Sequence, residues 1–322
     1  MAQRLADLIT WTRFSNTAQW SALGFGVIND SPANTRNGDD SILITGSLEG
    51  SEEPALQNNR SLKFGTGNNL ISIQLNADTT SGGDALLNSI GASIKSSGNL
   101  TIDIRDTVGQ AADFRNGIVN YGSIGVSGNN ALTITVRSQS KYSLINGGVN
   151  NSAIPLASRV TGGSQADAID VNGIIDNLTG STINLFAGDD ALVAKGLYGH
   201  GDITLKTMAR DILTGVGRDS IDVSAGLLFD TGGLSNVCID LGADDDVIRA
   251  FGTARLYGGK GLDTLLLPIG DYQVLTTAVK GCFQISDGTT NLYVSGFEQV
   301  GNFAGTLSDF PIGSGIGVLS LT

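Results

Sequence analysis

Glycine-rich turns that carry one aspartate are the segments of this chain best suited to chemistry. The clearest is the segment 256–265, LYGGKGLDTL, which follows the pattern G-G-x-G-x-D-x-L. Its glycines free the backbone, so carbonyl oxygens can turn toward a cation, and Asp263 adds a carboxylate. Ca²⁺ takes about six to eight oxygen ligands of these two kinds. The spacing therefore predicts a calcium site.

A second turn stands one short coil earlier. Asp246 precedes Asp263 by 17 residues, which suits two turns stacked in register. The predicted ligands are Gly242, Asp244, Asp246, Gly259, Gly261 and Asp263, with a weaker set at Asp190, Gly215, Gly217 and Asp219. The alternative is an Asx turn, in which each side chain bonds the backbone of its own turn.

The turn recurs along the chain and predicts a repeat. Its Asp or Asn stands at positions 40, 69, 84, 130, 167, 190, 219, 246 and 263. Between the turns apolar residues alternate with others, as at Leu132, Ile134 and Val136, which indicates strands with one inward face. Stacked coils bury such faces as a continuous column. We therefore predict an all-β chain folded as a parallel β-solenoid or β-roll-like repeat, with a two-domain sandwich as the alternative.

Three regions are expected. Residues 1–30 read as a short N-terminal helical cap or connector, because Leu5, Leu8, Ile9 and Trp11 follow a helical period. Residues 31–267 form the solenoid, and residues 268–322 form a C-terminal β block.

Composition narrows the function classes. The 31 acidic residues exceed the 19 basic ones, for a net charge of −12, so no nucleic-acid partner is expected. No apolar run approaches the ~20 residues of a membrane span. Two cysteines, Cys238 and Cys282, are too few for a disulfide framework and are interpreted as small buried residues. Whether they pair stays open.

The search for catalytic residues predicts no enzyme. The chain holds one histidine, His200, and no spacing of a nucleophile and base that supports a triad. The segment Asp103-Ile104-Arg105-Asp106 could serve sugar chemistry on a solenoid face, but charges that alternate with a core stripe are usually the solvated face. A solenoid polysaccharide lyase or epimerase is thus the least favoured alternative.

The segment 242–303 resembles the hemolysin-type calcium-binding repeat family, also called repeats-in-toxin or RTX. Besides the glycine-rich turn, it runs through Tyr272-Gln273-Val274, then Asp287-Gly288, then Leu292 to Val300, a block that often follows such repeats. It lacks the family's tandem perfect nonapeptides. The resemblance implies bound Ca²⁺ and the type I secretion machinery as a partner. It also implies an uncleaved signal in the C-terminal residues and an extracellular or cell-surface location.

Together these features predict a secreted, non-catalytic, calcium-associated β-solenoid that self-assembles into an extracellular filament, layer or matrix. The open ends of a solenoid present unpaired strand edges, so other copies of the chain are the expected partner. Trp11, Phe14 and Trp20 add apolar surface near one end. The alternative is a calcium-dependent adhesin or a polysaccharide-binding protein whose partner is a cell-surface polysaccharide.

Overall fold

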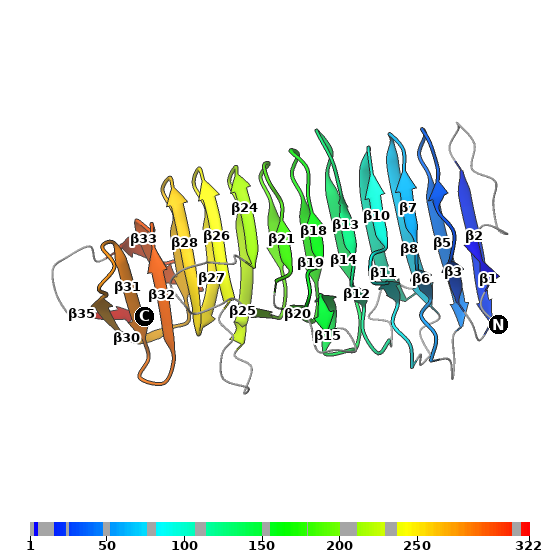
Figure 1. Ribbon diagram of the computed structural model, residues 1–322. Coiled ribbons are helices and arrows are strands. Elements are labelled where there is room, and N and C mark those ends of the chain that lie inside the picture. Colours follow the sequence, from blue (N-terminus) through cyan, green and yellow to red (C-terminus); the bar gives the residue numbers. More distant parts are fainter. Residues whose placement is uncertain are drawn as a thin grey trace.

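The chain winds into stacked coils that run along one axis from the N-terminal to the C-terminal end (Figure 1). The computed structural model describes residues 3–5, 16–23, 26–47, 52–75, 82–106, 114–149, 155–178, 180–199, 211–228, 237–310 and 317–322. Each coil contributes up to three short strands, and each strand pairs in parallel with its counterpart in the next coil. The fold is therefore all-β with large parallel sheets, as the sequence predicted, and it has the layout of a solenoid rather than a sandwich.

The coils present three faces. The first face contains β2 (Thr17–Leu23), β5 (Ser41–Ser47), β8 (Asn68–Leu75), β11 (Asn99–Asp106), β14 (Leu132–Val136), β19 (Ala168–Val171), β22 (Ala191–Val193), β25 (Ser220–Leu228), β27 (Val247–Gly252), β29 (Thr264–Leu267) and β33 (Gln299–Asn302). The second contains β1 (Gln3–Arg4), β3 (Val27–Asn29), β6 (Leu56–Asn58), β9 (Leu86–Asn88), β12 (Ile118–Asn120), β15 (Tyr142–Asn146), β20 (Ile174–Asn177) and β23 (Gly196–Gly199). The third contains β4 (Ala33–Asn34), β7 (Ser61–Phe64), β10 (Ser93–Ser96), β13 (Ser123–Val126), β18 (Arg159–Thr161), β21 (Thr182–Asn184), β24 (Ile212–Val216), β26 (Val237–Ala243), β28 (Ala254–Lys260) and β32 (Asn291–Ser295). A small antiparallel pair, β16 (Gly148–Val149) and β17 (Pro155–Leu156), lies outside the three faces.

The core is one continuous apolar column between the faces. On the first face, each strand places an aliphatic side chain directly over that of the previous coil, so that Ile42, Ile71 and Ile102 are in register. These residues are at most 1 % exposed. Because like residues stack on like, every coil has the same inward shape and can dock on the next.

The N-terminal helical cap expected over residues 1–30 is not supported. The described part of that range forms β1, β2 and β3, which are strands of the first coils. Thr17 and Gln19 are exposed while Ala18 between them is buried, and this alternation suits an edge strand better than a helix. Of the four residues that suggested the helix, Leu8, Ile9 and Trp11 lie outside the described residues.

Antiparallel strands are added to the sheets at the C-terminal end. β30 (Gly270–Thr276) pairs with β31 (Cys282–Ser286) and with β35 (Gly317–Leu321), and β31 pairs with β32. β34 (Leu307–Asp309) pairs with β33. The parallel repeat itself continues through β32 and β33, which stack on β28 and β29.

The two cysteines are free thiols on separate strands of the sheet that contains the third face. Cys238 lies on β26 and Cys282 on β31, with β28 and β32 between them. Three strand spacings amount to about 14 Å, beyond the Cα separation of up to about 7 Å that a disulfide spans. A bond between them within one chain would therefore require the sheet to rearrange.

Candidate functional site

Most of the predicted calcium-site carboxylates belong to a buried column at the corner that precedes the first face. Each member stands two residues before the inward aliphatic residue of its strand. The described acidic members are Asp40, Asp167, Asp190, Asp219, Asp246, Asp263 and Glu298. All but Glu298 are at most 2 % exposed. The sequence thus identified every one of these members except Glu298, although they come from coils spread between residues 40 and 298.

The column is built by hydrogen bonds between successive coils. The backbone N–H of Asp190 donates to Oδ1 of Asp219 at 2.8 Å, and that of Asp219 donates to Oδ1 of Asp246 at 2.8 Å. The N–H of Asp246 in turn donates to Oδ1 of Asp263 at 3.0 Å. Asp219, Asp246 and Asp263 therefore bond the backbone of the preceding coil in these contacts. Asp167 also bonds its own turn, as in the alternative interpretation, because its Oδ2 accepts the N–H of Gly163.

The second oxygen of the same carboxylates is left without a partner. Buried Oδ2 atoms that accept no hydrogen bond in the described part of the chain belong to Asp40, Asp190, Asp219, Asp246 and Asp263. An unpaired buried carboxylate oxygen is costly, and a protein can satisfy it with a proton or with a cation. The column therefore has one free buried acceptor in each of several coils.

Burial sets the protonation of these groups. Loss of solvation raises the pKa of Asp190 and Asp246 to about 7, partly offset by the backbone N–H bonds. Loss of solvation also raises the pKa values of Asp167 and Asp263, to about 6. Neighbouring carboxylates in the column add repulsion at Asp190 and Asp246. Near neutral pH, Asp190 and Asp246 are thus poised between a protonated form and a charged form that needs a counter-ion.

The glycine turns lie in the predicted register. Gly215 pairs with Gly242, and Gly242 pairs with Gly259. All three adopt positive φ, and a Cβ on Gly242 would lie 1.9 Å from the carbonyl oxygen of Gly215. Only glycine allows the turns of successive coils to approach so closely. The same approach packs the backbone of each turn directly against the carbonyl of the turn in the preceding coil.

Asp244 differs from the other predicted ligands. It occupies the register position of Gly217 and Gly261, with φ of 84°, and its side chain is exposed. Its N–H donates to the carbonyl of Lys260 at 2.8 Å. Asp244 could therefore contribute its carbonyl to a cation in the turn, whereas its carboxylate stands apart from the buried column.

Each aspartate of the column comes from a different coil, so the carboxylates are spread along the axis. Among the described residues, no group of three or more His, Cys, Asp or Glu side chains gathers as a metal cluster. A cation here would need the glycine carbonyls for most of its ligands. Oxygen ligands of this mixed kind suit Ca²⁺ and not a transition metal.

A second buried polar column went unpredicted. Six asparagines end successive strands of the second face: Asn29, Asn58, Asn88, Asn120, Asn146 and Asn177. Each Nδ2 donates to Oδ1 of the next asparagine at 2.7–2.8 Å, and Asn177 donates to Oδ1 of Asp211 at 3.2 Å. All are at most 2 % exposed. Asparagine two residues after Val, Leu or Ile, repeated at intervals of 26 to 32 residues, is the sequence signal that identifies this ladder.

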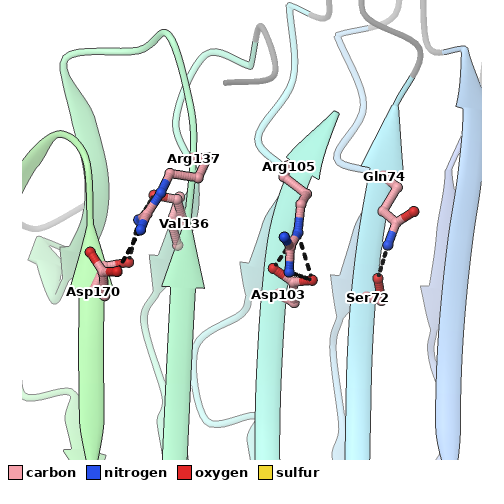
Figure 2. A network of polar contacts seen from close by, with 7 residues as sticks. All are labelled: Ser72, Gln74, Asp103, Arg105, Val136, Arg137 and Asp170. Carbon is pink, nitrogen blue, oxygen red and sulfur yellow. Dashed lines mark hydrogen bonds and ion pairs between the residues drawn. The ribbon is translucent and has the colours of Figure 1, made fainter. Parts of the chain in front are cut away.

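Charged residues on the outer surface of the first face are paired. Figure 2 shows two ion pairs between a guanidinium and a carboxylate, Arg105 with Asp103 and Arg137 with Asp170. The Arg137–Asp170 pair links neighbouring coils, whereas the Arg105–Asp103 pair lies within β11. Asp103 was the candidate for acid–base sugar chemistry, and its carboxylate is taken up by this intrastrand ion pair. His200 lies outside the described residues.

Comparison with family models, curated proteins and solved structures found no match, so the site's function is inferred from its own geometry. No helix in the described part of the chain is long and apolar enough to cross a membrane.

Proposed function

We propose that the chain is a non-catalytic, calcium-binding structural protein that acts outside the cell and joins end to end with copies of itself. The observation that carries the proposal is the set of buried, unpartnered Oδ2 atoms beside the stacked glycine turns. The carboxylates of Asp190, Asp219, Asp246 and Asp263, with carbonyls of the turns between 215 and 261, would hold the ions. Bound Ca²⁺ would supply the positive charge that lets the column ionise.

Calcium is expected to stabilise the folded chain through this column. Millimolar Ca²⁺ should raise the melting temperature by roughly 5 °C or more, because a ligand that binds only the folded state stabilises it. Asp246→Asn should lose most of that gain, since the amide keeps an oxygen for the Asp219 N–H but removes the charge. Thermal melts followed by circular dichroism, with and without Ca²⁺, measure both effects.

Asp40→Asn is the matched control. Asp40 belongs to the same column and has the same unpartnered Oδ2, but it lies outside the run of glycine turns from 188 to 261. Its substitution should leave the calcium response intact. Melting curves of the intact protein that do not move with Ca²⁺ would contradict the proposed site.

The open end of the solenoid supports assembly. In the described part of the chain β2 pairs on one side only, with β5. The Asn16 carbonyl accepts the Ser41 N–H, so the backbone groups of alternate residues from Thr17 onward, including Gln19, point to the open side. At the other end, β34 and β35 each pair on one side only among the described strands. Two unlike open edges give a head-to-tail contact, which extends instead of closing into a dimer.

Gln19→Pro is expected to block assembly without unfolding the chain. Proline removes the N–H on the open side of β2 and leaves the bonds to β5 in place, and edge strands tolerate it. Light scattering of the intact protein at high concentration should show large species, and the variant should stay at 33 kDa with an unchanged circular dichroism spectrum. The conservative variant Gln19→Thr should still assemble. A monodisperse intact protein, with and without Ca²⁺, would refute end-to-end joining.

A further inference from the structure

The outer surface of the third face carries positive charge in an otherwise acidic chain. Between β7 and β21 the outward residues are Ser61, Lys63, Ser93, Lys95, Ser123, Gly125, Arg159, Thr161, Thr182 and Asn184. None of them is acidic, although the whole chain has 31 acidic residues against 19 basic ones. This surface is therefore a local exception to the net charge of −12.

Two lysines stand side by side on this surface. Lys63 and Lys95 are register partners on β7 and β10, about 4.8 Å apart in the direction of strand pairing. Both side chains are exposed, and neither forms an ion pair or a hydrogen bond with a described residue. Like charges directly opposite on neighbouring strands destabilise a sheet. An anionic partner would relieve this repulsion.

A groove leads away from the lysine pair across the coils. One hollow of about 360 Å³ is lined by Lys63, Lys95 and Thr161, and a second of about 520 Å³ shares Val126, Ser127 and Thr161 with it. Gly125 forms the floor where a side chain would otherwise stand. A Cβ there would lie 1.9 Å from Oγ1 of Thr161, so the packing of the coils keeps this floor open.

An exposed aromatic ring lies at the far end of the groove. Phe186 lines the second hollow and is 51 % exposed. Its φ is 69°, a left-handed conformation that costs a bulky residue free energy. The ring gains no burial that would offset this cost. A contact between the ring and a bound ligand would give a physical reason for phenylalanine at this position.

We propose that this groove binds an acidic oligosaccharide. Lys63 and Lys95 would hold the carboxylates of uronic-acid units, the hydroxyls of Ser127 and Thr161 would bond sugar hydroxyls, and Phe186 would pack against the apolar face of a sugar ring. From β7 to β21 the groove crosses four strand spacings, about 19 Å, which suits a short linear chain of sugars. The second hollow borders the aspartate column at Gly163, whose N–H donates to Oδ2 of Asp167, but none of the proposed sugar contacts uses a carboxylate of the column, so binding should not require calcium.

Titration calorimetry with tetragalacturonate in calcium-free buffer tests the site. The intact protein should bind tetragalacturonate, and its affinity should fall with added salt. It should not bind an uncharged cello-oligosaccharide of the same length. The double variant Lys63→Gln, Lys95→Gln should bind at least tenfold more weakly. Lys195→Gln with Lys280→Gln, which removes the same charge from exposed lysines elsewhere, should bind as the intact protein does.

Phe186→Gly separates recognition from folding. Glycine adopts the observed φ without strain, so the melting temperature should hold or rise while affinity falls at least fivefold. Equal loss of binding in both lysine double variants would show a general charge effect and overturn the proposed site. Tighter binding of a single-stranded oligonucleotide of equal charge would overturn the assignment to a sugar.

Discussion

Replacement of Asn88 by aspartate is expected to destabilise the fold by at least ~4 kcal/mol, the largest effect of any single substitution proposed for this chain. The Nδ2 of Asn88 donates to Oδ1 of Asn120 at 2.7 Å and to the carbonyl of Ser123 at 3.2 Å. Aspartate has no donor to offer when ionised, so its charged oxygen would face two acceptors in a site with no solvent exposure. Urea denaturation followed by circular dichroism at pH 8 measures the loss.

Asn291→Asp is the matched control for this substitution. Asn291 is exposed, and its Oδ1 accepts from Gln284, a role that a carboxylate oxygen can keep. Its unfolding midpoint should change little. The Asn88→Asp protein should also recover part of its stability at acid pH, where a protonated carboxyl donates one hydrogen bond again. Equal stability of the two variants at pH 8 would show that the ladder does not hold the coils together.

The metal-free protein is expected to become more stable on acidification from pH 8 to pH 5. Burial raises the pKa of Asp190 and Asp246 to about 7, and of Asp263 to about 6, above the ~3.9 of an unfolded chain. Between about pH 4 and pH 7 the folded state therefore binds more protons than the unfolded state. The free energy of unfolding must then fall as pH rises through that window and level off above it.

Calcium should remove or reverse this pH dependence, because the ion compensates the charge that protonation otherwise removes. Urea denaturation at pH 5, 6, 7 and 8, once with chelator and once with Ca²⁺, gives the slope of the free energy of unfolding against pH in each condition. In chelator, Asp246→Asn should have a shallower slope than the intact chain, since one of the titrating groups is gone. Metal-free stability that is flat or declines toward pH 5 would contradict a buried, shifted column.

Local pattern was enough to predict the repeat and the glycine–aspartate turns. The alternation of Leu132, Ile134 and Val136 became a strand, and the spacing of 17 residues between Asp246 and Asp263 became one coil. These features depend on neighbouring residues and on backbone freedom, both of which a sequence displays directly. The stacking of Gly242 on Gly259 follows from the same short interval.

Turns separated by longer intervals could not be assigned to a corner of the solenoid from the sequence. Asp84 and Asn130 resemble turn aspartates, yet the column positions in their coils belong to Leu100 and Leu132. Asp84 instead pairs with Arg115 in the next coil. Coil length varies here because the turns between faces differ, so spacing alone does not tell which corner a turn occupies. The asparagine ladder was missed for a related reason, since asparagine is ordinary in turns and its burial appears only once the coils are stacked.

Coil stacking also determines how the molecule would respond to a pulling force. One coil adds about 4.8 Å to the axis but stores a long stretch of chain, such as the 30 residues from Asn58 to Asn88. Pulled out straight, those 30 residues span about 100 Å. A force applied at the chain ends would peel coils off one after another. Each released coil would extend to about twenty times the height that it occupied in the stack. A fibre of such units would yield in discrete steps, absorbing work while the coils still in place stayed folded.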